Sequence, residues 1–230
     1  MFLQSQNFFD FPRDIKHVRL RRKILLALLW TLIVLYPNPL LLAESVYRLF
    51  NPPVNPEHHI PVEEWKQLVD KLPSNPPKIE EFVARYVKYD YDFNVYGVPW
   101  YLPTPAEVVE KRKGDCKSRA VLLAAILEYK GVPYSFHISP VHFWVDYPGK
   151  EENEFTKKYE NPKTAIYSDG RWKLPELVDL RTYYDSWKAV LWDSMPVIRK
   201  ALLLGGWILI FSRDRLMGME LKRGLKRKGG

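Results

Sequence analysis

The chain has only one cysteine, Cys116, among its 230 residues. A single thiol cannot close a disulfide within the chain, so a disulfide-stapled scaffold is excluded. A zinc site built from several cysteines is excluded for the same reason. Hydrophobic residues make up 47% and aromatic residues 14% of the chain, which excludes a disordered or collagen-like protein. The length suits one medium domain with extensions, or two small domains, with a real core.

Acidic residues are scarce at the two ends of the chain. Residues 1–23 contain six basic and two acidic residues, and residues 213–230 contain seven basic and two acidic. The residues between them are close to neutral, with 22 basic and 23 acidic, although the whole chain carries +8. A domain that binds nucleic acid is expected to carry a basic patch on its folded part. The charge distribution therefore predicts that nucleic acid is not a partner.

Charge is missing altogether from two apolar segments beside these basic ends. Residues 24–43 include 16 apolar residues and no charge, which is close to the ~20 residues of a transmembrane helix. The long charged segment ahead of them, and the lack of an A-x-A-like site before Glu44, argue against a secretory leader. A buried core helix is a further alternative. Residues 201–211 are too few to cross a bilayer, so we extend this segment back to 189 and expect a second span or an interfacial helix.

The order of basic and apolar segments determines the expected topology. Positive residues beside a span favour the cytoplasmic side, so we expect a multi-pass protein of the cell membrane with both termini in the cytoplasm and residues ~44–196 outside. The expected organisation is a basic segment (1–23), a transmembrane helix (24–43), a Pro-rich connector with a short helix (44–78), a domain (79–188), the second transmembrane or interfacial helix (189–211) and a basic tail (212–230).

Two helix starts inside the domain carry capping signals. Residues 104–107 read Thr-Pro-Ala-Glu, a capping box with proline at the first helical position, and this helix is expected to end near residue 114. Asp115 can cap the next helix, which begins at Cys116 and stops at Gly131. Residues 120–127 are apolar on almost every side, so this second helix is predicted to be the buried central helix of the domain.

Weaker periodicities complete the expected elements. Apolar residues at helical spacing predict amphipathic helices over residues 62–72 and 79–89. Two strand-like runs follow the central helix, over residues 134–139 and 141–147. In the second run His142, Trp144 and Asp146 alternate with apolar residues, so these three side chains should share one face of the strand.

Cys116 and His142 are the candidate nucleophile and base. The positive end of a helix dipole stabilises a thiolate, and an imidazole beside it can carry the proton to a leaving group. Unpaired N–H groups at the same helix end can hold an oxyanion. Cys116, His137 and His142 could instead bind a metal, but no clustered carboxylate or third histidine accompanies them, so we expect no metal and no cofactor.

The sequence at these residues resembles the transglutaminase-like superfamily of papain-type thiol enzymes. The matching pieces are TPAEVVEKRKGDCKSRAVLLAAILEYKGVPYSFH (104–137), VHFWVDYP (141–148) and DGRWKLPELVDL (169–180). The resemblance implies an α+β fold in which a buried cysteine helix packs on an antiparallel sheet, here flanked by transmembrane helices. It also implies a Cys–His–Asp triad of Cys116, His142 and Asp179, with Asp169 as a rival for the third place.

Two departures from the family pattern accompany this resemblance. Members usually have an acidic or aromatic residue soon after the cysteine, whereas Lys117, Ser118 and Arg119 follow it here. The interval between His142 and the proposed aspartate is also long. For the second oxyanion donor, position alone suggests Trp100 or Tyr101.

Two functions of different classes follow from these observations. The first is a membrane-anchored thiol enzyme that transfers acyl groups at amide bonds of a protein or peptide substrate, with peptidase or amidase activity favoured over protein cross-linking. The second is a catalytically inactive domain of the same fold that acts as a membrane-tethered binding or assembly module. The sequence does not identify the substrate or the oligomeric state.

Overall fold

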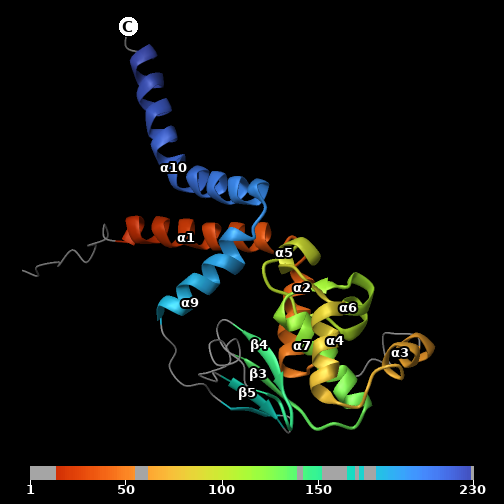
Figure 1. Ribbon diagram of the computed structural model, residues 1–230. Coiled ribbons are helices and arrows are strands. Elements are labelled where there is room, and N and C mark those ends of the chain that lie inside the picture. Colours follow the sequence, from red (N-terminus) through yellow and green to blue (C-terminus); the bar gives the residue numbers. More distant parts are fainter. Residues whose placement is uncertain are drawn as a thin grey trace, which may run out of the picture. The chain divides into compact units, whose positions relative to one another are not determined.

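The computed structural model describes residues 14–54, 62–138, 142–151, 165–168, 171–173 and 180–228. It is a mixed α+β structure, mostly helical with small sheets, which confirms the predicted fold class at that level (Figure 1). The chain divides into two compact units. One unit combines the two ends of the chain, up to Pro37 and from Val197 onward, and the other runs from Asn38 to Pro196.

The unit from Asn38 to Pro196 holds most of the elements. Its helices are α2 (Pro39–Phe50), α3 (Val62–Val69), α4 (Pro76–Tyr86), α5 (Asp92–Val95), α6 (Pro105–Lys111), α7 (Cys116–Tyr129), α9 (Leu180–Trp187) and the π-helical η2 (Lys188–Asp193). Its strands are β1 (Lys88–Tyr89), β2 (Lys113–Gly114), β3 (Ser135–Ile138), β4 (Phe143–Asp146), β5 (Ala165–Ser168) and β6 (Arg171–Lys173). The other unit consists of α1 (Asp14–Leu35) and α10 (Val197–Lys228).

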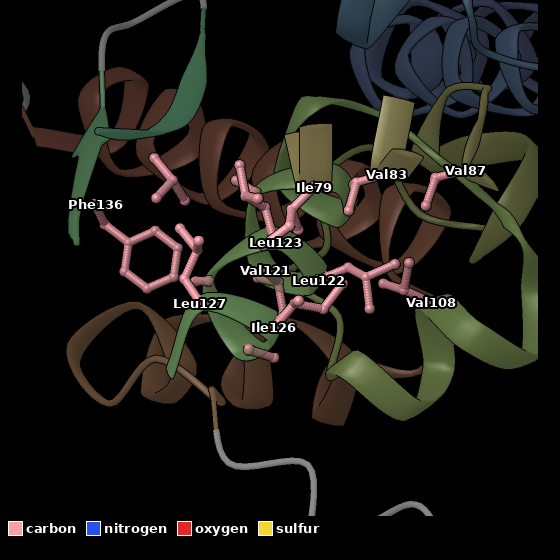
Figure 2. Packing of buried hydrophobic residues seen from close by; sticks show 14 of the residues in the cluster. Ile79, Val83, Val87, Val108, Val121, Leu122, Leu123, Ile126, Leu127 and Phe136 are labelled. Atoms are coloured by element: carbon pink, nitrogen blue, oxygen red, sulfur yellow. The ribbon is translucent and has the colours of Figure 1, made fainter. Parts of the chain in front are cut away.

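Helix α7 is the buried centre of the larger unit, as the sequence predicts. Every residue from Ala120 to Leu127 is buried, and helices α4 and α6 and strand β4 all pack against α7. Figure 2 shows its side chains interleaved with those of α4, α6 and β3, including Val83, Val108 and Phe136. Burying apolar area on every side of one helix supplies most of the stabilisation of such a unit, and it fixes the position of the helix end that carries Cys116.

A four-stranded antiparallel sheet, in the order β4-β3-β5-β6, packs on α7 through β4. In the β3–β4 register Phe136 lies opposite Val145, and both are buried in the core cluster with α7. His137 lies opposite Trp144, on the other face of the pleat. The predicted alternation along β4 is therefore confirmed, with Phe143 and Val145 on the core face.

The prediction of a helix over residues 79–89 is wrong at its C-terminal end. Helix α4 ends at Tyr86, and the next residues form β1, which pairs in parallel with β2. The guanidinium of Arg119 donates hydrogen bonds to the carbonyl oxygens of Ala84 and Val87, each at 3.0 Å. These last carbonyls of a helix have no partner within the helix, so a side chain from α7 satisfies them and ends α4 there.

The predicted helix over residues 24–43 is also broken. Helix α1 ends at Leu35 and α2 begins at Pro39, with the Asn38 side chain accepting from the Leu40 N–H at 3.1 Å. Pro37 and Pro39 lack the N–H that a continuous helix needs. Pro196 separates η2 from α10 in the same way within the expected segment 189–211.

None of the described helices, taken singly, is both long and apolar enough to cross a membrane. Two bent pairs could cross one by length and composition alone, namely Leu20–Leu35 with Pro39–Phe50 and Tyr184–Asp193 with Val197–Ser212.

Helices α1 and α10, from opposite ends of the chain, pack against each other in antiparallel directions. This pair of helices is called the α1–α10 hairpin below. The Trp30 indole N–H donates to the Leu202 carbonyl at 3.0 Å, and the Trp207 indole N–H donates to the Thr31 hydroxyl at 3.0 Å. At the end of the hairpin nearer the termini, Lys23 Nζ lies 3.4 Å from the Phe211 carbonyl oxygen. The outward surface of the hairpin is apolar, with exposed side chains at Leu20, Ile24, Leu25, Leu26, Leu28, Leu29, Leu32, Ile33, Val197, Ile198, Leu202, Leu204, Trp207, Ile208, Leu209 and Phe211.

Two adjacent glycines in α10 provide a matched test of this hairpin. A Cβ on Gly206 would lie 1.9 Å from the Trp30 Nε1 atom, whereas a Cβ on Gly205 meets nothing within 4 Å. We expect Gly206→Ala to destabilise the hairpin by about 1–3 kcal/mol, the usual effect of overpacking. Gly205→Ala should instead stabilise the helix by about 0.5–1 kcal/mol. Thermal unfolding in detergent micelles, followed by tryptophan fluorescence, measures both, and equal effects of the two variants would contradict the packing.

Candidate active site

The loop before α7 is built so that Cys116 is the first residue of the helix. The Asp115 carboxylate accepts from the Lys117 backbone N–H at 2.9 Å, which confirms the predicted cap. The chain also approaches itself closely here, because a Cβ on Gly114 would lie 2.0 Å from the hydroxyl oxygen of Ser118, a fully buried residue. The close approach of Ser118 therefore requires glycine at position 114, and Asp115 is required as the cap of α7.

The capping box at the start of α6 is present as predicted. Thr104 Oγ1 accepts from the Glu107 N–H at 3.3 Å, and the Glu107 carboxylate accepts from the Thr104 N–H at 2.7 Å. Arg48 of α2 pairs with the same carboxylate at 3.1 Å. This pairing links α2 to the helix that leads into the cysteine loop.

The Cys116 thiol lies against the start of β4. The backbone N–H of Phe143 donates a hydrogen bond to the sulfur, and the residue immediately before Phe143 is His142. The His142 ring stacks on Trp144, with centroids 5.6 Å apart and planes 9° from parallel. Residues 116 and 142, which are far apart in the sequence, are thus brought to neighbouring positions at the edge of the α7–β4 interface.

The third member of the predicted triad lies outside the described residues. This holds for Asp179 and equally for its rival Asp169.

Tyr101, one of the two suggested oxyanion donors, already forms hydrogen bonds within the protein. Its N–H donates to the Asp92 carboxylate at 2.8 Å, and its hydroxyl donates to Glu107 at 2.6 Å. Tyr101 therefore cannot supply an N–H to a substrate in this arrangement.

The thiol is protonated in the resting structure. Burial, followed by the neighbouring Asp115 carboxylate, raises the pKa of Cys116 to about 12, against lowering effects from Lys117 and the Phe143 N–H. A lowered pKa is expected at the N-terminus of a helix. Here desolvation and an adjacent negative charge exceed that stabilisation, so any attack by this sulfur needs a base to remove the proton.

Beside the thiol lies a buried group of three charges that the sequence did not reveal. The Lys117 ammonium contacts the Asp115 carboxylate directly and lies 2.9 Å from the Asp92 carboxylate. All three residues are buried. The pKa of Lys117 is raised well above its ordinary value by the two carboxylates, so the ammonium stays charged. Burial, and to a smaller degree the neighbouring Asp115 carboxylate, raises the pKa of Asp92 to about 7, against the lowering effect of the Lys117 ammonium.

The sequence contains one indication of these buried charges, which can be recognised once α7 is known to be buried on every side. A lysine directly after the cysteine of such a helix must either reach solvent or find a buried counter-charge. Asp115 supplies one partner and was identified only as a cap. Asp92 supplies the other from α5, more than twenty residues earlier in the chain. No spacing rule connects that position to Lys117.

Further tyrosine and histidine side chains lie on strands β1 and β3. Tyr89 of β1 is about half exposed, and burial of its hydroxyl, followed by the effect of Cys116, raises its pKa. The Arg119 guanidinium lies over the Tyr89 ring, 5.4 Å from its centroid. His137 is buried on the Trp144 face of the sheet, with Nε2 2.9 Å from the Ser135 hydroxyl. Among the described residues, no group of three His, Cys, Asp or Glu side chains is placed to hold a metal ion.

Comparison of the chain with protein-family models and with curated proteins found no significant match. The transglutaminase-like resemblance therefore depends on the motif residues alone.

Proposed function

We propose that this protein is a membrane-anchored thiol enzyme of the transglutaminase-like, papain-type class that transfers acyl groups at amide bonds. The observation that supports it best is the position of the Cys116 sulfur, at the first turn of the buried helix and hydrogen-bonded to the residue that follows His142. The antiparallel sheet packed on this helix is the arrangement that such a core requires. Proteins and peptides are the proposed substrates.

In the proposed reaction, His142 removes the proton from the Cys116 thiol as the sulfur attacks the amide carbon. A carbon–sulfur bond forms, the carbon–nitrogen bond of the tetrahedral intermediate breaks, and the imidazolium returns the proton to the leaving amine. A backbone N–H of the first turn of α7, other than that of Lys117, which donates to the Asp115 cap, stabilises the oxyanion. Asp179 orients the imidazole. Water then resolves the acyl-enzyme, which gives amide hydrolysis in preference to cross-linking.

Trapping the acyl-enzyme tests this proposal without knowledge of the natural substrate. The full-length protein in detergent micelles is incubated with p-nitrophenyl acetate, and the intact mass is measured. We expect a single acetyl group on Cys116, released by hydroxylamine as a thioester is. The Cys116→Ala variant should remain unmodified. An unmodified wild-type protein, or acetylation that is equal in the variant, would exclude the activity.

The membrane anchor is the second part of the proposal. The exposed surface of the α1–α10 hairpin is apolar over a wide arc of both helices, a pattern typical of helices in lipid and not of one-sided amphipathic helices. Basic residues flank the apolar parts of both helices, such as Arg22 and Arg213, and these favour the cytoplasmic side. Cytoplasmic reporters fused to either terminus should be active, and a reporter inserted between residues 152 and 160 should be active only outside the cell. An inserted reporter that is active in the cytoplasm would exclude this topology.

The raised pKa of the thiol favours a second candidate, a catalytically inactive domain used as a tethered binding or assembly module. A protonated, hydrogen-bonded cysteine can serve as a small packing residue beside the buried charges. The acyl-enzyme experiment separates the two candidates, because a binding module has no reason to form a thioester that depends on His142.

A further inference from the structure

The buried charges beside Cys116 do not balance. Two carboxylates and one ammonium lie within one small region, with Lys117 Nζ 2.9 Å from Asp92 and in direct contact with Asp115. One carboxylate oxygen of Asp92, Oδ1, has no hydrogen-bond partner among the described residues. With both carboxylates ionised the group has a net charge of −1, in surroundings where an uncompensated charge is costly.

This net negative charge lies next to a thiol that must itself become negative in order to react. The carboxylates of Asp115 and Asp92 both disfavour ionisation of Cys116, and the ammonium of Lys117 favours it. A thiolate beside two unneutralised carboxylates would be strongly opposed, because like charges interact more strongly where water is excluded. The lysine is therefore the only positive charge among the residues shown to act electrostatically on the sulfur.

We propose that Lys117 is a positioning residue whose buried ammonium neutralises Asp92 and Asp115 and thereby controls how readily Cys116 loses its proton. This inference rests on the proposed function only in taking Cys116 as the reacting group. Lys117 does not touch the substrate. It also holds three segments together, since Asp92 accepts from the Tyr101 N–H and Asp115 caps α7.

Two further titratable groups lie on the elements next to the Cys116 sulfur. Tyr89 comes from β1, where Cys116 influences the pKa of its hydroxyl. His142 comes from the residue before β4. The Lys117 ammonium also acts on the Tyr89 hydroxyl and lowers its pKa. Changes at Asp92 or Lys117 are expected to reach the thiol through charge.

Alkylation of Cys116 by iodoacetamide between pH 7 and 10 tests the proposal. The full-length protein contains no other thiol, so incorporation measured by mass reports this residue alone. Asp92→Asn removes a negative charge and should accelerate alkylation about tenfold at pH 9, the effect of lowering the pKa of the thiol by one unit. Lys117→Met removes the positive charge and should slow it about tenfold. Asp70→Asn, at an exposed residue of the connector after α3, is the control and should leave the rate unchanged.

The opposite signs distinguish electrostatic control from a merely structural role. If the three residues only held the fold together, both substitutions would loosen the site, expose the sulfur and accelerate alkylation. If Lys117→Met does not fold, Asp92→Asn is compared with Asp92→Glu, which keeps the negative charge and disturbs the packing more. Equal acceleration of these two variants, or an Asp92→Asn rate equal to or below that of wild type, overturns the proposal. Alkylation needs no turnover, so its rate can respond to the charge substitutions even if no acyl-enzyme forms. If an acyl-enzyme does form and the alkylation rate does not respond to these substitutions, only this inference is rejected.

Discussion

Replacing Leu122 with alanine is expected to lower the free energy of unfolding by about 3 kcal/mol, within the usual range for a buried leucine. Leu122 is fully buried in the cluster around α7 (Figure 2). Truncation removes apolar contacts and leaves a cavity that well-packed neighbours cannot close completely. Urea denaturation of the full-length protein in detergent micelles, followed by circular dichroism, measures the change.

The control for this experiment is Leu180→Ala. Leu180 is 84% exposed at the start of α9, so its truncation should change stability by less than about 0.5 kcal/mol. If Leu122→Ala were as mild as the control, α7 would not be the centre of the core. The position of Cys116 would then lose its structural basis, because the packing of α7 is what holds the helix end against β4.

Local signals in the sequence were enough to predict the part of the fold that carries the site. The capping box of α6, the Asp115 cap and the apolar run of α7 each depend on residues within a few positions of one another, and all three predictions are confirmed. The alternation along β4 is equally local. Such features need no knowledge of distant parts of the chain.

The predictions that are wrong involve partners from elsewhere in the chain or backbone limits that hydropathy ignores. Helix α4 stops early because Arg119, on another helix, takes its last carbonyls. The apolar segment 24–43 is broken because its prolines lack a donor, although its hydropathy continues through them. Within the candidate site, Asp92 joins Lys117 only through the tertiary fold, so the buried charges could not be read from spacing.

Replacing His142 with alanine is expected to slow acetylation of Cys116 by p-nitrophenyl acetate about 10³-fold, within the range that a general base contributes. Stopped-flow release of nitrophenolate from the full-length protein measures the rate. Added imidazole should restore part of the rate in His142→Ala and have no comparable effect on wild type.

The size of this effect follows from the state of the thiol. Because burial and the Asp115 carboxylate raise the pKa of the Cys116 thiol well above its ordinary value, the thiolate is the minor form at pH 7. A preformed thiolate–imidazolium pair is therefore not the resting state, and the proton must leave as the sulfur attacks. Removing the base should consequently reduce the rate at which the thiol is acylated and leave its resting ionisation almost unchanged. A variant that acetylates as fast as wild type, with the same pH profile, would show that His142 is not the base and would favour the binding module.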